Sequence, residues 1–230
     1  MPIPHPDAAL LRALLIQYDD GSGDWPALAW RAGDGWQMIS SAVLGGGMGP
    51  RSWVLNAQVG HGYARLDPHR HLREIAQQHG LTGHGVGLMT AARVTEAAFA
   101  RDGDVEALVT AGIGVSGWAA EAPAVDAATQ AQSALVPGTI NIIVALPVAL
   151  SPAAMVNAVA TATEAKVQAL RDAGFDASGT PTDAVCVASR EAGDEVPFAG
   201  PRSPWGARLA RAVHLSTLEA ALRYRARRLS

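Results

Sequence analysis

The pattern of apolar and polar positions is clearest in one stretch of the second half of the chain. Residues 139–146 are apolar and rich in β-branched side chains, which is typical of a buried strand. An alanine-rich segment follows, in which Ser151 is placed to cap a helix, Pro152 suits its first turn and Gly174 supplies a left-handed stop. Residues 184–188 form another short apolar run. Strand, helix and strand together have the length of a parallel βαβ crossover.

Short apolar runs and two more amphipathic segments make up the rest of the pattern. Turn-forming sequences separate the first three runs, which predicts a small antiparallel meander. We expect strands at residues 14–18, 27–31, 36–43, 52–59, 86–94 and 105–111, and helices at 68–79 and 207–229. The last helix is expected to turn its larger apolar side chains inward, namely Leu209, Val213, Leu218 and Leu222.

These elements predict an α/β fold, with α+β as the alternative. We expect one domain over residues 1–230, with a mixed β-sheet covered by about three main helices. A chain of 230 residues is long enough for a sizeable core, and 49% hydrophobic residues with 17% charged residues argue against disorder.

Polar side chains gather at one predicted edge of the crossover. Thr139 and Asn141 begin the first strand, and Thr180, Thr182 and Asp183 lead into the second. If the two strands are parallel, both groups lie at the same edge of the sheet, where a site can form. A structural role is the alternative, because Thr and Asp before a strand also form turns.

The connecting helix carries Glu164 and Lys166 on a nearly apolar background. The two positions are about 200° apart around the helix and cannot pair on one face, whereas Thr161 and Glu164 share a face. Lys166 is the single Lys among 18 Lys and Arg residues. Since an ammonium and a guanidinium are not interchangeable, we expect Lys166 to be kept for its shape or hydrogen bonding; chance in a Lys-poor chain is the alternative.

The net charge and the apolar runs of the chain exclude some classes of function. A net charge of −3 gives no footprint for nucleic acid. No apolar run reaches the roughly 20 residues that span a bilayer, and the start lacks the features of a signal peptide, so we expect a cytoplasmic protein without membrane insertion.

Cys186 is the only cysteine, which excludes an internal disulfide, and it is expected to be a packed core thiol. His69 and His71 point to different faces of their helix, and no metal site is expected.

Two glycine-rich segments attract attention. Gly45 and Gly46 belong to a glycine run that allows the backbone to approach a bulky planar ligand; a simple turn is the alternative. Residues 112–117 match G-x-G-x-x-G, but no long helix follows, so a turn is expected. Residues 119–136 have little apolar periodicity and are expected to form a surface excursion.

Six segments together carry a family resemblance. The chain resembles the adenosylcobinamide amidohydrolases, the CbiZ family of corrinoid salvage, in SSAVLGGG, VGLMTAA, GTINIIV, TATEAKVQAL, SGTPTDAVCVA and FAGPRSPWGARLARAV. These segments follow the order that the family has, and they span roughly residues 40–221.

The resemblance implies hydrolysis of the amide that joins aminopropanol to the corrin ring of adenosylcobinamide, giving adenosylcobyric acid and 1-amino-2-propanol for cobamide salvage. The expected partner is this corrinoid, its cobalt arrives with the substrate, and no further cofactor is expected. The oligomeric state stays open, a homo-oligomer included. Substrate contacts are expected at polar and glycine positions: Thr139, Asn141, Asn56, Thr90, Gly45 and Gly46.

Amide hydrolysis needs a nucleophile, donors for the oxyanion and an acid for the departing amine. Our first hypothesis is a water activated by Asp183. The remaining catalytic roles fall to polar neighbours: Thr180, Thr182 and Asn141 would hold the water or the oxyanion, and Glu164 or Lys166 would protonate the amine.

Two alternatives remain. Cleavage of the Gly138–Thr139 bond would free Thr139 as an N-terminal nucleophile whose own amine is the base. The second alternative is that the chain does not hydrolyse its ligand and is a corrinoid-binding module or a trafficking partner of a corrinoid importer.

Overall fold

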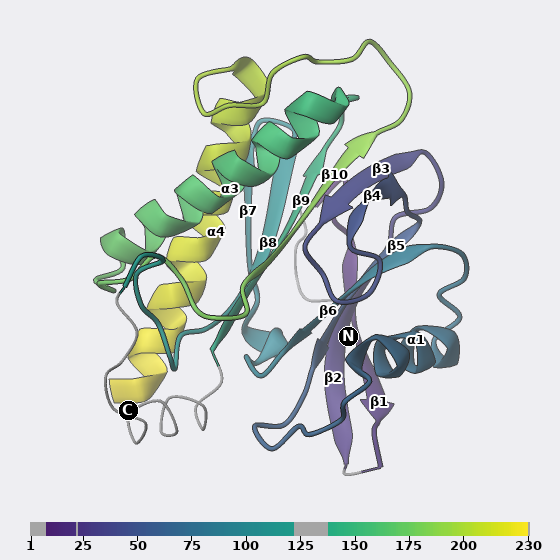
Figure 1. The fold of residues 1–230 in the computed structure, drawn as a ribbon, viewed down its shortest axis with the longest axis vertical. Helices are drawn as coiled ribbons and strands as arrows, with labels where there is room; N and C mark the ends of the chain where they lie inside the picture. Colours follow the sequence, from purple (N-terminus) through teal and green to yellow (C-terminus); the bar gives the residue numbers. More distant parts are fainter. Residues whose placement is uncertain (1–7, 22, 122–137, 230) are drawn as a thin grey trace.

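The computed structural model describes residues 8–21, 23–121 and 138–229 and arranges them in four layers (Figure 1). A four-stranded sheet and a six-stranded sheet pack face to face. One helix, α1 (Pro68–Gln78), covers the outer face of the smaller sheet, and two helices, α3 (Pro152–Asp172) and α4 (Pro204–Leu229), cover the outer face of the larger one. The α/β class and the three main helices agree with the sequence, whereas the single expected sheet is divided into two.

The smaller sheet has the order β1-β2-β5-β6, with β1 (Ala13–Asp19), β2 (Asp24–Arg31), β5 (Trp53–Gln58) and β6 (Gly85–Thr90). Its first three strands are antiparallel, and β5 pairs with β6 in parallel. Because α1 joins β5 to β6, this pair forms a βαβ unit that the apolar pattern alone did not reveal.

The larger sheet has the order β4-β3-β10-β9-β8-β7. Its strands are β4 (Gly47–Pro50), β3 (Trp36–Ser40), β10 (Ala184–Arg190), β9 (Thr139–Leu146), β8 (Val105–Gly112) and β7 (Ala98–Asp102), with the short helix η1 (Val94–Glu96) before β7. The expected meander is therefore wrong, because β3 leaves the first hairpin and pairs with β10. A hydrophobic run fixes which faces are buried, but not which neighbour a strand takes.

The crossover around α3 is confirmed. Strands β9 and β10 are parallel, with Ala184 opposite Asn141. The Ser151 hydroxyl accepts a hydrogen bond from the backbone N–H of Ala154 (3.2 Å), and Gly174 adopts a φ of +84° at the end of the helix. These are the cap and the stop that the sequence indicates.

Alternation along the strands builds two cores around the larger sheet. Ile140, Ile142 and Val144 face α3 and α4, whereas Ile143 and Cys186 face the smaller sheet. Cys186 is fully buried, and burial raises its pKa to about 12, as befits a core thiol.

Helix α4 packs through small side chains rather than through all of its leucines. Ala212, Ala220 and Ala221 are buried, while Leu222 is 39% exposed and Leu218 is only partly buried. The prediction for Leu222 is wrong because small residues let the helix approach the sheet closely and turn that side chain towards solvent. Among the described residues, no helix is long and apolar enough to cross a membrane.

Candidate active site

The parallel pairing of β9 and β10 brings the polar residues together at the edge where both strands begin, as the sequence predicts. Asp183 is the centre of this group. Its Oδ1 accepts hydrogen bonds from the Ile140 backbone N–H (2.9 Å) and the Thr180 hydroxyl (2.5 Å), and its Oδ2 accepts one from the Thr180 backbone N–H (3.2 Å). The carboxylate is thereby fixed to both strands of the crossover.

Lys166 completes the shell of Asp183 from the middle of α3. Its Nζ lies 2.5 Å from Asp183 Oδ2, and the two side chains are only 9% and 11% exposed. The single lysine of the chain thus forms a largely buried ion pair, which the sequence did not predict. With this bond, the carboxylate accepts four hydrogen bonds, about the number of lone pairs that it has.

Gly179 makes room for the ion pair, a role that was not predicted from the sequence. A Cβ at this position would lie 2.3 Å from Asp183 Oδ2 and 2.6 Å from Lys166 Nζ, distances at which real atoms collide. The glycine-rich turn at residues 112–117 is hydrogen-bonded to Gly179, because the Gly117 backbone N–H donates to the Gly179 carbonyl (3.1 Å). That turn is the expected one, while most of the predicted excursion at 119–136 lies outside the described residues.

Two threonine hydroxyls lie beside the carboxylate. Thr139 Oγ1 and Thr182 Oγ1 are 2.5 Å apart. Thr182 also donates to the Gly138 carbonyl (2.9 Å), so the proton of the shorter contact comes from Thr139. Both threonines line the cavity described below.

A buried pair of asparagines lies next to the threonines, between the two sheets. The Asn141 amide N–H₂ donates to Asn56 Oδ1 (2.8 Å) and to the Met89 carbonyl (3.1 Å), and Asn56 donates to Thr110 Oγ1 (3.0 Å). A carbonyl only accepts, so the nitrogen of Asn141 must face Met89.

The orientation of Asn141 changes its expected role. Both of its N–H groups are used, so none is left for an oxyanion. Its Oδ1 is buried and has no hydrogen-bond partner among the residues that the structure describes. An unsatisfied buried acceptor is costly, so a donor group that reached this oxygen would gain a favourable hydrogen bond.

A cavity of about 480 Å³ opens in front of this group. Its polar wall includes Thr139, Asn141, Thr182 and Asp183 from the larger sheet and Thr90 from the end of β6. Among the residues that the structure describes, Asp183 is the only one with a carboxylate that lines it. The lining also includes apolar residues, among them Val43, Val59, Leu88 and Met89.

His61 and Tyr63 also line the cavity, and the sequence analysis missed both. They follow β5 in the segment GHGY, where one histidine and one tyrosine beside glycines do not have the spacing of a ligand or catalytic motif. The Tyr63 ring stacks on His71 of α1, with centroids 5.6 Å apart, and its hydroxyl lies 3.1 Å from His71 Nδ1. Burial lowers the pKa of His71 below its ordinary value and raises that of Tyr63.

Not every predicted site residue joins the cluster. Glu164 is exposed on α3, because its position lies about 200° from Lys166 around the helix. Gly45 lines a different cavity, and Gly46 packs on its own turn, where a Cβ would lie 2.5 Å from the Ala42 carbonyl. Asn56 orients Asn141, and the Thr90 hydroxyl accepts from the Ala92 backbone N–H (3.0 Å) at the cavity wall.

Comparison with known proteins identifies the family of the chain. Residues 15–229 match the model of the family described as adenosylcobinamide amidohydrolase. The chain is 32% identical over 183 residues to an adenosylcobinamide amidohydrolase of Methanosarcina mazei, covering 75% of this chain and 84% of that protein. It is 39% identical over 122 residues to a protein of the same name from Halobacterium salinarum, covering about half of each chain. The chain therefore belongs to the adenosylcobinamide amidohydrolase family.

Proposed function

We propose that the protein hydrolyses the amide between aminopropanol and the corrin ring of adenosylcobinamide. The products are adenosylcobyric acid and 1-amino-2-propanol, and the acid returns to cobamide assembly in the cytoplasm. Family membership supports the amidohydrolase chemistry. The observation that carries the proposal is a cavity lined by Asn141 and by Asp183, the only carboxylate of its lining within the described part of the chain, where the buried Oδ1 of Asn141 has no partner. The amide of the substrate is secondary and has one N–H, and Asn141 Oδ1 would accept a hydrogen bond from it.

In our mechanism, Asp183 takes a proton from a water as the water oxygen adds to the amide carbon. To do so it gives up one of its hydrogen bonds, for which the Thr180 hydroxyl, free to rotate, is the natural candidate. The hydroxyls of Thr139 and Thr182 rotate away from their present acceptors, Thr182 Oγ1 and the Gly138 carbonyl, and donate to the oxyanion instead. Asp183 then passes the proton to the departing amine, so that the same carboxyl is both base and acid.

This mechanism revises two of the roles that the sequence suggested. Lys166 is a positioning residue, because it lies behind Asp183 and does not line the cavity. Glu164, exposed on α3, takes no part. The corrinoid brings its own cobalt, and the mechanism uses no other cofactor.

One specific contact favours Thr139 as an alternative nucleophile. The Thr182 hydroxyl donates to the carbonyl of Gly138, the group that Thr139 would attack if the chain cleaved itself at Gly138–Thr139. Such cleavage would leave fragments of 138 and 92 residues, since the chain has 230. Intact-protein mass spectrometry decides, because the water mechanism keeps one chain.

The decisive experiment is to incubate the purified protein with adenosylcobinamide and detect cobyric acid and free aminopropanol by mass spectrometry. We expect Asp183→Asn to lose about 10²-fold or more in rate while it still binds the corrinoid. The exposed Glu164→Gln should keep full activity and serves as the control. Full activity of Asp183→Asn would refute the mechanism, and a corrinoid spectral shift without any release would indicate a binding or trafficking protein.

A further inference from the structure

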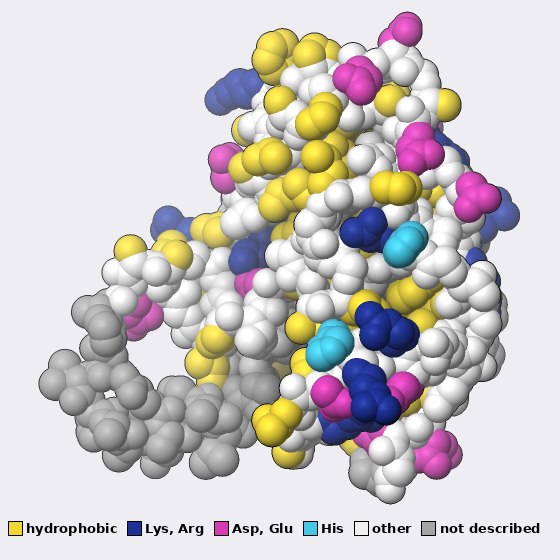
Figure 2. Space-filling view, turned by 45° about the vertical axis from the view of Figure 1, so that its right-hand side comes forward, with side chains coloured by type: hydrophobic (Ala, Val, Ile, Leu, Met, Phe, Trp, Pro, Cys, Tyr) yellow, Lys and Arg dark blue, Asp and Glu magenta, His cyan; other side chains and the backbone are white. Residues whose placement is uncertain are grey.

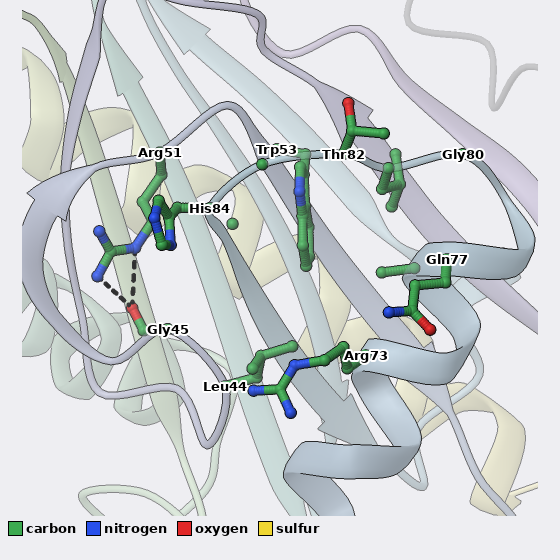
Figure 3. Close-up of a pocket in the computed structure, with 13 residues that line it drawn as sticks. Leu44, Gly45, Arg51, Trp53, Arg73, Gln77, Gly80, Thr82 and His84 are labelled. Carbon is green, nitrogen blue, oxygen red and sulfur yellow. Dashed lines mark hydrogen bonds between the residues drawn. The ribbon is translucent and has the colours of Figure 1, made fainter.

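A second cavity, of about 530 Å³, lies at the opposite end of β5 and β6 from the candidate active site (Figure 3). It is formed where these strands begin, at Trp53 and Gly85, and by the C-terminal half of α1. The active-site cavity is formed where the same strands end, at Val59 and Thr90. The two cavities share no lining residue.

The second cavity is basic. Arg51, Arg73 and His84 line it, and no Asp or Glu of residues 8–21, 23–121 and 138–229 does so. Arg73 is exposed on α1 and forms no hydrogen bond or ion pair with any described residue. Figure 2, which brings the α1 side of the molecule forward, shows Lys or Arg side chains close to His side chains with apolar side chains exposed between them.

The glycine-rich loop that the active site did not use holds Arg51 in this cavity. The guanidinium donates to the Gly45 carbonyl through Nε (3.3 Å) and Nη2 (3.2 Å), and to the Pro50 carbonyl through Nη1 (2.8 Å), as Figure 3 shows for Gly45. A Cβ at Gly49 would lie 2.7 Å from Nη1, and one at Gly45 would lie 1.9 Å from the Gly85 carbonyl. These contacts use three of the five N–H groups that a guanidinium has, so two remain for a ligand.

Trp53 also lines the cavity. It is 5% exposed, and its Nε1 is buried without a hydrogen-bond partner among the described residues. Gly85 lies flat against the indole, since a Cβ there would come within 2.0 Å of the ring. An indole N–H only donates, and leaving it unpaired in a buried place is costly.

We propose that this cavity binds a small organic phosphate. The phosphate would contact Arg51, Arg73 and His84, because guanidinium groups match the geometry of a phosphate. Three separate cationic or donor groups also suit the three terminal oxygens of a phosphate better than the two oxygens of a carboxylate ligand. Leu44, Ala76 and Leu81 give the cavity an apolar wall for the organic part. The volume falls in the usual range of small-molecule sites, about 300–1,000 Å³.

The proposal is tested by calorimetric titration of the full-length protein with phenyl phosphate, inorganic phosphate and phenol. We expect saturable binding of phenyl phosphate at one site, weaker binding of inorganic phosphate and none of phenol. Arg73→Gln should weaken phenyl phosphate binding about tenfold, and because Arg73 is exposed this variant should fold normally. The matched control is Arg70→Gln, which removes the same charge from the same helix at a position outside the cavity.

Absence of saturable binding, or an equal loss in Arg70→Gln and Arg73→Gln, would overturn the proposal. Equal affinity for inorganic and phenyl phosphate would overturn its organic part. The site is independent of amide hydrolysis, so Asp183→Asn should bind phenyl phosphate as the wild type does. Loss of binding in that variant would place the ligand in the active-site cavity and would also contradict the proposal.

Discussion

At the scale of single residues, the ion pair between Lys166 and Asp183 is the strongest constraint on the site. Both side chains are nearly buried, and their nearest atoms are 2.5 Å apart. Lys166→Met should therefore lower the free energy of unfolding by about 3 kcal/mol, because it leaves a buried charge without its partner. Urea unfolding measures the change.

A double variant gives the control for the ion pair. Combining Lys166→Met with Asp183→Asn removes the uncompensated charge, so its loss of stability should be smaller than the sum of the two single losses. Additive losses would show that the two residues act independently. Lys166→Arg keeps the charge but places a larger group where Gly179 is in close contact, so we expect it to be less stable than the wild type.

At the scale of elements, the loop before β10 depends on the absence of a side chain at Gly179. Gly179→Ala would push a methyl group against both members of the ion pair and should cost about 1–3 kcal/mol as well as most of the activity. The control is Gly62→Ala, where a Cβ would meet nothing within 4 Å. Equal stability of the two variants in thermal unfolding would contradict the crowding argument.

Helix α1 connects stability to pH through His71. Burial holds its pKa below the ordinary 6.5, so the folded protein binds fewer protons than the unfolded chain just below that pH. This contribution to stability is complete above about pH 6.5 and is lost as the pH falls through the lower folded value. We expect the melting temperature to fall between pH 7 and pH 5, and to fall less in His71→Gln.

The same titration should affect the candidate site. Tyr63 lines the active-site cavity, and its hydroxyl lies 3.1 Å from His71 Nδ1. A protonated imidazole only donates, so the Tyr63 hydroxyl can keep this contact with α1 only as the acceptor. A melting profile of His71→Gln that followed the wild type at every pH would disprove the role of His71.

At the scale of the whole molecule, the two sheets share a core that contains Cys186. Its pKa of about 12 and complete burial should prevent reaction with thiol reagents in the native state at pH 8. Because the sheets cannot separate without exposing this core, labelling of the single cysteine should follow the loss of circular dichroism through one urea transition. Labelling that precedes the main transition would show that the sheets unfold separately.

The sequence determined the local features of the fold for local physical reasons. The strand before α3, the cap at Ser151, the stop at Gly174 and the buried Cys186 follow from side-chain shape and hydrophobic period, which act over a few residues. Parallel pairing of the flanking strands then brings Thr139 and Asp183 to one edge. These features could be predicted because each of them depends on near neighbours in the chain.

Only the tertiary structure decided the features that depend on distant partners. Strand β3 joins β10 rather than its hairpin neighbours, and Lys166 pairs with Asp183 across a loop. Met89 and Asn56 orient the amide of Asn141 and so determine which way its Oδ1 points. The glycine-rich loop near Gly45 binds the side chain of Arg51. A sequence pattern gives the face on which a side chain lies, whereas pairing, register and hydrogen-bond direction arise when separate elements pack together.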